Sequence, residues 1–227
     1  MDRQLIVFDM DGVLVDVTES YREAIVQTVK HFTGAAISRN EIQDYKNRGG
    51  YNDDWKLSHH VITGHGITVD LQTVIDYFQG IFHGNGSGEA GLILREQWIA
   101  GDGLFDRLAA RFDFALFTGR MRWEAQVTLN RFAPSLRFDP IIGMEEVTAL
   151  KPSPEGLLKI AAAAGDRKIW YIGDTIDDAR SARGADVPFI GIASPRSPKY
   201  ADLVAVFRSE NAVAVIDDIN QLESVLP

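Results

Sequence analysis

An α/β fold is predicted by three observations on this sequence. From about residue 101 onward, short apolar runs alternate with amphipathic helical segments, which is typical of a parallel sheet covered by helices on both faces. A further apolar run lies near the N-terminus, whereas residues 16–100 show helical spacing without a clear strand. We therefore expect a Rossmann-like, doubly wound parallel sheet core formed by residues 1–15 and 101–227, with an inserted helical domain formed by residues 16–100.

The strands and helices of the core follow from the period of the apolar residues. Leu5 to Phe8 is a continuous apolar run, the pattern of a strand covered on both faces, and it ends where the acidic residues begin. The further expected strands are Asp113–Phe117, Ile141–Gly143, Lys168–Gly173 and Pro188–Ala193. The helices expected between them are Arg122–Phe132, Pro154–Ala164 and Asp177–Ala185.

The inserted segment contains two stretches of helical periodicity. Apolar residues recur at helical spacing at Tyr21, Ile25, Val29 and Phe32, and again at Leu71, Ile75, Phe78 and Phe82. The glycine-rich stretch Gly84–Gly91 predicts a mobile loop, and Gly101–Gly103 predicts the hinge through which the chain returns to the core.

Charge and composition argue against several classes of protein. The net charge of −9 and the pI near 5.0 disfavour nucleic-acid and membrane-surface partners, because phosphate backbones and anionic lipids would be repelled. An anionic substrate must then be met by local cations or by a metal ion. The absence of cysteine excludes disulfides and thiolate metal sites. We expect a cytoplasmic protein, since no signal peptide and no membrane-spanning segment is visible in the sequence.

Two aspartates follow the first expected strand. Asp9 and Asp11 are one residue apart, and Gly12 gives the chain room to turn after them. Ligands of open parallel sheets bind just beyond such strand ends, so both carboxylates can face one crevice. The pair suggests a site where one oxygen attacks while its neighbour moves a proton. The alternative is an acidic loop that caps the following segment.

Two further motifs lie near expected strand ends. Thr118 and Gly119 stand where a strand opens into a helix, so a hydroxyl and free backbone N–H groups can hold a phosphate oxygen. A plain threonine N-cap is the alternative there. Lys151 precedes a proline-initiated helix, although a solvated surface position is the commoner explanation of a single lysine.

A third motif ends a strand in three carboxylates. Asp174, Asp177 and Asp178 follow the apolar run that closes with Gly173. Helix capping explains one of these acids, but the mutual repulsion of all three favours a bound cation.

Taken in order, these motifs resemble the haloacid dehalogenase superfamily, in its branch of magnesium-dependent phosphatases with a helical cap inserted after the first strand. The resemblance covers almost the whole chain. It implies that Asp9 is the nucleophile and that Asp11 is the general acid and base. It also implies that Thr118 and Gly119 bind phosphoryl oxygens, and that Lys151 offsets charge on the nucleophile and the phosphoryl group.

The resemblance also implies a Mg²⁺ ion and a small phosphorylated metabolite as substrate. Asp174 would ligate the metal together with Asp9 and a group at Asp11, and Asp178 would be a further ligand or support the ligands. The role of Asp177 is less defined. Hard oxygen ligands of this kind are those that Mg²⁺ prefers, and positive charge is needed because a phosphate monoester would otherwise repel an attacking carboxylate.

Several activities share these core motifs. Asp11 disfavours dehalogenation, because a halide leaving group needs no proton, so a phosphatase is expected first. A phosphomutase of the β-phosphoglucomutase kind differs mainly in its cap. A phosphonatase would form a Schiff base on a cap lysine, and Lys30, Lys46 or Lys56 could be mistaken for that residue. A non-catalytic phosphate-binding protein is the alternative of another class, although every matched polar position is intact.

Substrate specificity is expected to depend on the cap. The segment Lys46–Trp55 is its most unusual part, with Asn52 as a candidate substrate-binding residue, while an N-cap with a buried tryptophan is the alternative. The segment is similar to one in a subgroup of capped phosphatases, some of which are fused to a histidine-biosynthesis dehydratase, and this points to histidinol phosphate. Arg120 could meet a second anionic group of the substrate, or could form a surface salt bridge.

Overall fold

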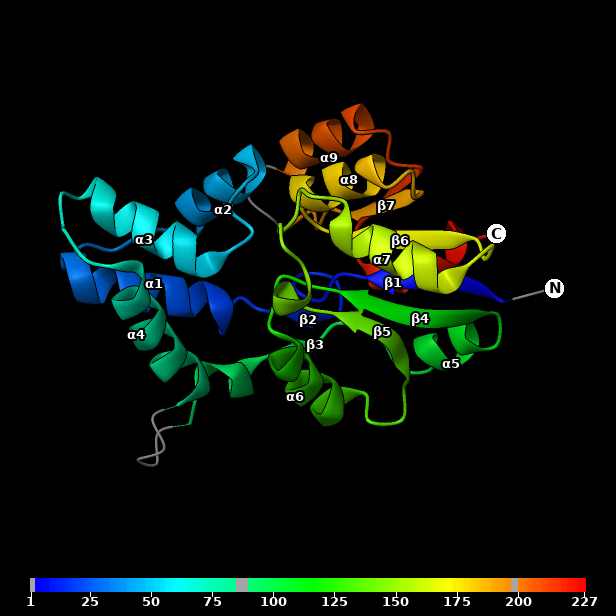
Figure 1. The fold of residues 1–227 in the computed structure, drawn as a ribbon, viewed down its shortest axis with the longest axis horizontal. Coiled ribbons are helices and arrows are strands. Elements are labelled where there is room, and N and C mark those ends of the chain that lie inside the picture. The colour runs from blue at the N-terminus through cyan, green and yellow to red at the C-terminus, as the bar shows by residue number, and fades with distance from the viewer. Residues whose placement is uncertain (1–2, 85–89, 197–199) are drawn as a thin grey trace. The chain divides into compact units, whose positions relative to one another are not determined.

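The computed structural model describes residues 3–84, 90–196 and 200–227 (Figure 1). The chain divides into two compact units, one formed by Met1–Val15 with Trp98–Pro227 and the other by Asp16–Gln97. The chain thus returns to the first unit before the glycines at which the hinge was predicted. Gly103 instead precedes the helix α5 (Leu104–Ala109) as its N-cap.

The first unit is built on a six-stranded sheet in the order β5-β4-β1-β6-β7-β8, and the paired strands are parallel. The strands are β1 (Gln4–Phe8), β4 (Phe112–Phe117), β5 (Phe138–Ile142), β6 (Ile169–Gly173), β7 (Phe189–Ile192) and β8 (Ala214–Ile216). The predicted α/β parallel sheet is confirmed. From β1 the chain adds β4 and β5 on one side and then β6, β7 and β8 on the other, so the strand order reverses at β1. Ligands of such sheets bind beyond the carboxyl ends of the strands at the point of reversal.

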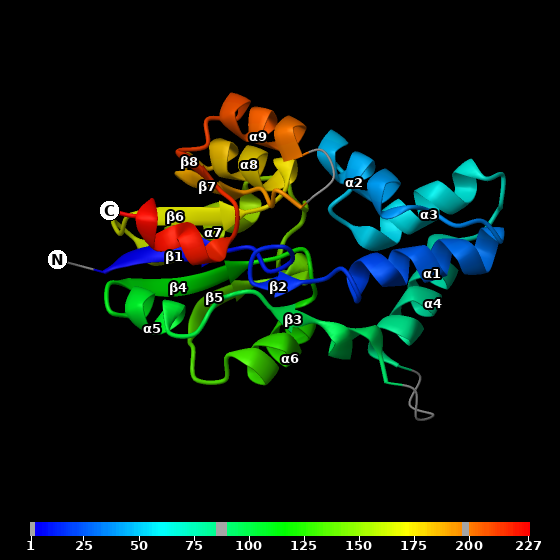
Figure 2. The ribbon, with the colours of Figure 1, turned by 180° about the vertical axis from the view of Figure 1, so that it is seen from behind.

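Helices cover both faces of this sheet. They are α5, α6 (Arg122–Phe132), α7 (Glu155–Ala164), α8 (Ile176–Gly184) and α9 (Tyr200–Ser209). Figures 1 and 2 show α8 and α9 on one side of the sheet and α5 and α6 on the other. Among the described residues, no helix combines the length and the apolar character needed to cross a membrane.

The two faces of β1 pack into different cores because successive strand side chains point to opposite sides. Leu5 and Val7 are fully buried in a cluster with apolar residues of α7, α8 and α9. Phe8 faces the other way and packs against Phe105 of α5, with ring centroids 5.6 Å apart. Strand β1 is thus packed on both of its faces, and this fixes the position of Asp9 directly after it.

The second unit is helical. Its helices are α1 (Tyr21–Thr33), α2 (Arg39–Arg48), α3 (Asp54–Gly64), α4 (Leu71–His83) and the short η1 (Leu92–Arg95). Tyr21 of α1 packs against Phe82 of α4 with ring centroids 4.0 Å apart, so the two predicted periodic stretches meet in one core. Ser38 and Glu41 form a capping box at the start of α2, and Asp53 caps α3.

Two short strands border this unit and were not expected. β2 (Val15–Asp16) and β3 (Gln97–Trp98) pair with each other where the chain leaves and re-enters the first unit. Strands of two residues are too short for alternation of apolar residues to be visible in a sequence. Most of the glycine-rich loop predicted at Gly84–Gly91 lies outside the described residues.

Glu155 at the start of α7 holds the loop that leads into the helix. Its carboxylate accepts hydrogen bonds from Lys159 (2.7 Å), from the backbone N–H of Thr148 (2.9 Å) and from that of Ala149 (3.0 Å). These bonds, chiefly those from Lys159 and Thr148, lower the pKa of Glu155 to about 2. Since the folded pKa lies below the unfolded value, the stabilisation is present at neutral pH and is lost as the pH falls through the acidic range.

We therefore expect Glu155→Gln to lower the melting temperature at neutral pH. The difference in melting temperature between this variant and the wild type should narrow as the pH falls from about 5 to about 3. Thermal unfolding followed by circular dichroism at several pH values measures both. Glu223→Gln, which removes an exposed ion pair with Arg107, is the matched control and should have little effect. A difference for Glu155→Gln that stayed constant over this pH range would contradict the argument.

Candidate active site

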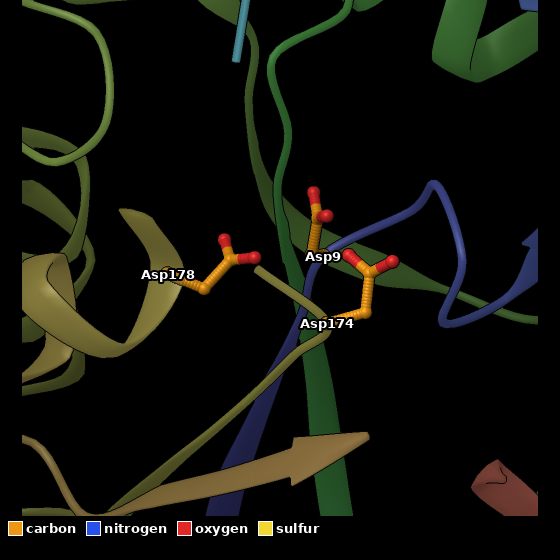
Figure 3. A group of neighbouring side chains, drawn as sticks. All are labelled: Asp9, Asp174 and Asp178. Atoms are coloured by element: carbon orange, nitrogen blue, oxygen red, sulfur yellow. The ribbon is translucent and has the colours of Figure 1, made fainter. Parts of the chain in front are cut away.

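Three carboxylates converge at the carboxyl end of the sheet, where the strand order reverses. Asp9 follows β1, Asp174 follows β6, and Asp178 lies in the first turn of α8 (Figure 3). Each offers one oxygen atom, and these atoms all lie within 4.8 Å of one another. Asp9 and Asp178 are buried, and Asp174 is partly buried. The predicted acids from two separate strands therefore do meet in space.

Lys151 lies between two of these acids. Its ammonium is 2.8 Å from an oxygen of Asp9 and 2.8 Å from an oxygen of Asp178, and its side chain is buried. The ring of Phe117 lies 4.7 Å from the ammonium and adds a cation–π contact. The surface position considered for Lys151 is therefore wrong.

The charges of this group depend on one another. Burial raises the pKa of Asp9 to about 7, because Lys151 only partly compensates and Asp178 and Asp11 add repulsion. Burial acts to lower the pKa of Lys151, but Asp178 and Asp9 outweigh it and keep the ammonium charged. Three carboxylates against one ammonium leave an excess of negative charge, and this favours binding of a cation.

Asp178 is held on both of its oxygens. Oδ1 accepts a hydrogen bond from the hydroxyl of Tyr171 (2.6 Å) as well as contacting Lys151. Oδ2 accepts from the backbone N–H (3.0 Å) and the hydroxyl (2.5 Å) of Thr175. Although burial opposes it, Lys151 holds the pKa of Asp178 below its usual range. Asp178 is thus placed to orient Lys151, and its direct contact with a metal stays a prediction.

Asp11 and Gly12 form a tight turn after β1. The backbone N–H of Gly12 donates to the carbonyl of Val15 (2.9 Å), and that of Leu14 donates to the carbonyl of Met10 (2.9 Å). Gly12 has φ +75°, a conformation that side chains with a Cβ rarely adopt. A Cβ there would lie 2.0 Å from Oδ2 of Asp174, so the turn and this carboxylate can approach only because residue 12 is glycine.

The Thr118–Gly119 turn, predicted to bind phosphate, has fewer free backbone N–H groups than expected. Thr118 is buried, and its own backbone N–H donates to the carbonyl of Ile142 (3.0 Å). Its hydroxyl accepts from the backbone N–H of Arg120 (3.2 Å). These two N–H groups are therefore engaged within the protein. In the part of the chain that the structure describes, the Thr118 hydroxyl and the N–H of Gly119 remain for a ligand.

Arg120 is not on the surface, contrary to one of its two predicted roles. Its side chain is only 1% exposed, and Nε donates to Oδ1 of Asp11 over 2.8 Å. Its other predicted role, contact with a second anionic group of the substrate, stays a prediction. The contacts of Arg120 and Tyr171 were missed because the sequence has no signal for a tertiary hydrogen bond.

The roles of the remaining candidates are less defined. Asp177 is buried in the first turn of α8. Asn52 belongs to the unit Asp16–Gln97, so its contact with a substrate stays a prediction. In the same unit, Lys46 pairs with Asp54 and Lys56 pairs with Asp53, whereas Lys30 is exposed.

Comparison with known proteins adds independent findings. The sequence profile of the haloacid dehalogenase-like hydrolases matches residues 4–186. Imidazoleglycerol-phosphate dehydratase from Phytophthora nicotianae is 31% identical over 202 residues, which cover 86% of this chain but only 44% of that protein. Phosphoglycolate phosphatase from Cereibacter sphaeroides is 26% identical over 184 residues, covering 81% of this chain and 82% of that protein.

A solved structure supports the same grouping. Phosphatase Tt82 from Thermococcus thioreducens has a TM-score of 0.64 and 25% sequence identity, and the match covers 92% of this chain and 99% of that one. The chain thus spans less than half of the dehydratase, but most of both phosphatases.

Proposed function

Because this chain belongs to the haloacid dehalogenase-like hydrolases, we propose that it is a Mg²⁺-dependent phosphatase that hydrolyses a phosphate monoester through an aspartyl-phosphate on Asp9. The observation that carries the proposal is the buried contact of Asp9 with Lys151, beside Asp174. A carboxylate in this position has a cation to orient it and a second acid with which to share a metal.

The residues present fit a hard divalent cation. Asp9 and Asp174, with Asp178 as a further candidate, offer only oxygen atoms, and their spacing is compatible with one ion. The turn at Gly12 lies directly against the carboxylate of Asp174. When bound, Mg²⁺ would offset negative charge on the phosphoryl group and on the attacking carboxylate.

We propose the following roles for the protein's own residues. An oxygen of Asp9 attacks phosphorus, and the bond from phosphorus to the leaving oxygen breaks while Asp11 donates a proton to that oxygen. Water then attacks the phosphoryl group, Asp11 takes a proton from it, and the carboxylate of Asp9 is released. Lys151 keeps Asp9 oriented, and Thr118 and Gly119 donate hydrogen bonds to phosphoryl oxygens.

The names of the relatives support a small phosphorylated metabolite as substrate. Both phosphoglycolate and imidazoleglycerol phosphate are small molecules with one phosphate ester. We therefore propose to begin a substrate screen with 2-phosphoglycolate and histidinol phosphate, followed by sugar phosphates.

The function is tested by hydrolysis of para-nitrophenyl phosphate by the purified protein. We expect hydrolysis that requires Mg²⁺ and stops with EDTA. Accumulation of a sugar phosphate isomer with little phosphate release would favour a mutase instead. Trapping of a cap lysine by borohydride with an aldehyde substrate would favour a phosphonatase. Binding of phosphate esters without any turnover would contradict the enzymatic proposal.

Gly12 gives a prediction about the metal site. Gly12→Ala should raise the Mg²⁺ concentration for half-maximal activity by about 10- to 100-fold, because the new methyl group displaces Asp174. Gly165→Ala is the matched control, since Gly165 also has a positive φ but has no atom within 4 Å of the added Cβ. An unchanged Mg²⁺ requirement in Gly12→Ala would show that Asp174 does not hold the metal.

A further inference from the structure

Arg120 is a buried arginine whose guanidinium faces the carboxylate of Asp11. Nε lies 2.8 Å and Nη2 lies 2.5 Å from the same oxygen, Oδ1. The side chain of Arg120 is 1% exposed, while that of Asp11 is 31% exposed. The contact therefore joins a fixed cation inside the protein to an acid that reaches the solvent side.

The position of Arg120 is set by contacts from three elements. Its Nη1 donates to the hydroxyl of Thr128 on α6 over 3.0 Å. Its carbonyl accepts from the backbone N–H of Met144, beyond β5, over 2.9 Å. A Cβ at Gly143 would lie 2.9 Å from the same carbonyl, so this approach depends on glycine. The backbone N–H of Arg120 donates to the hydroxyl of Thr118, which follows β4. Arg120 therefore has little freedom to move.

The chemistry of this contact distinguishes the two oxygens of Asp11. A guanidinium has only donors, so an oxygen that accepts two of its N–H groups is poorly placed to carry a proton itself. Oδ2 has no hydrogen-bond partner among the residues that the structure describes. Arg120 therefore holds Oδ1 and leaves Oδ2 as the oxygen of Asp11 that is open to a ligand.

We propose that Arg120 is a positioning residue that orients Asp11 so that Oδ2 exchanges the proton with the leaving oxygen and later with water. The inference rests on the proposed phosphatase function and adds to it a residue that acts through Asp11 rather than on the substrate. Arginine suits this role better than lysine, because its planar fork can donate to Oδ1 and to Thr128 at once.

The test compares two substrates in each variant. An alkyl phosphate needs protonation of its leaving oxygen, whereas para-nitrophenyl phosphate needs little, so the ratio of their kcat values reports on Asp11. We expect Arg120→Met and Arg120→Lys to lower kcat for the alkyl phosphate by about 10- to 100-fold more than for the aryl phosphate. This is part of the contribution of general acid catalysis, which is about 100- to 10,000-fold.

Two further variants separate this effect from a general loss of structure. Arg122→Met, which removes an exposed arginine paired with Glu146, is the matched control and should leave the ratio unchanged. Thr128→Val keeps the side-chain shape but removes the acceptor for Nη1, and should shift the ratio in the same direction to a smaller extent. It serves as the readout if the Arg120 variants fail to fold.

Coupling to Asp11 completes the test. In Asp11→Asn the substrate ratio should already be shifted, and adding Arg120→Met should shift it no further. Equal losses of kcat for both substrates in the Arg120 variants would overturn the positioning role while the phosphatase function stands. So would effects of Arg120→Met and Asp11→Asn on the substrate ratio that add fully in the double variant. A wild-type protein that hydrolyses neither substrate would overturn the proposed function, and the role of Arg120 with it.

Discussion

Asp9→Asn should lower the rate of Mg²⁺-dependent phosphate release by about four orders of magnitude or more, because an amide cannot replace a carboxylate as the attacking group. The substitution keeps the shape of the side chain. Lys151 retains its contact with Asp178, so the site should stay folded. The rate is measured with para-nitrophenyl phosphate at saturating Mg²⁺, and acid-quenched samples are examined for a phosphorylated aspartate.

The matched control is Asp113→Asn. Asp113 lies in β4 of the same sheet and pairs with Arg3 and Arg167 at the surface, with a side chain 45% exposed. Its loss should change the rate little. A phosphorylated aspartate is expected in acid-quenched samples of the wild type and of this control, but not in those of Asp9→Asn. Activity of Asp9→Asn within about tenfold of the wild type would remove Asp9 from the role of nucleophile.

The elements that sequence patterns predicted well are those with long, uninterrupted periodicity. Arg122–Phe132 was expected as a helix and forms α6 with the same bounds. The first strand was expected from Leu5 and begins one residue earlier, at Gln4. In both cases the local pattern and the tertiary packing favour the same structure, which is the condition for reading a fold from one sequence.

The edges of the sheet were predicted less well, for identifiable reasons. The strand expected at Ile141–Gly143 begins at Phe138, because Pro140 interrupts the apolar run but is tolerated in an edge strand such as β5. At the other edge, the three residues of β8 and the helix α9 before it were missed. A strand this short shows no usable alternation, and its pairing with β7 depends on the rest of the fold.

The site was predictable where it depends on topology and not where it depends on side-chain packing. Asp9 and Asp174 follow neighbouring parallel strands, and the carboxyl ends of such strands meet at one edge of a sheet. By contrast, an arginine after a Thr-Gly pair is expected at the surface from its residue type alone. Only the tertiary structure brings Arg120 to Asp11 and Tyr171 to Asp178.

Lys151→Met should both inactivate and destabilise the protein. Its ammonium is the cation shared by Asp9 and Asp178, which are themselves buried. Removing one partner from a buried ion pair leaves uncompensated charge and typically costs about 3–5 kcal/mol of unfolding free energy. We expect a loss of this size in urea unfolding monitored in EDTA, together with loss of turnover because the nucleophile is no longer oriented.

Conditions that neutralise the two carboxylates should reduce this destabilisation. Without Lys151, burial favours the protonated forms of Asp9 and Asp178, so their folded pKa values would exceed the unfolded ones. The variant therefore loses least unfolding free energy at pH values below the unfolded pKa of these carboxyl groups. The difference in unfolding free energy between Lys151→Met and the wild type should narrow as the pH falls from neutral to about 4. Added Mg²⁺ should stabilise the variant for the same reason, by binding the folded state only.

Lys159→Met is the matched control, because Lys159 forms an exposed ion pair with Glu155 and should contribute at most about 1 kcal/mol. The comparison separates a buried network of one lysine and two carboxylates from a single lysine–carboxylate pair at the surface. If Lys151→Met were as stable as the control in EDTA at neutral pH, Asp9 and Asp178 would not depend on this ammonium. The excess negative charge that favours a cation between the strands would then have to be neutralised in another way.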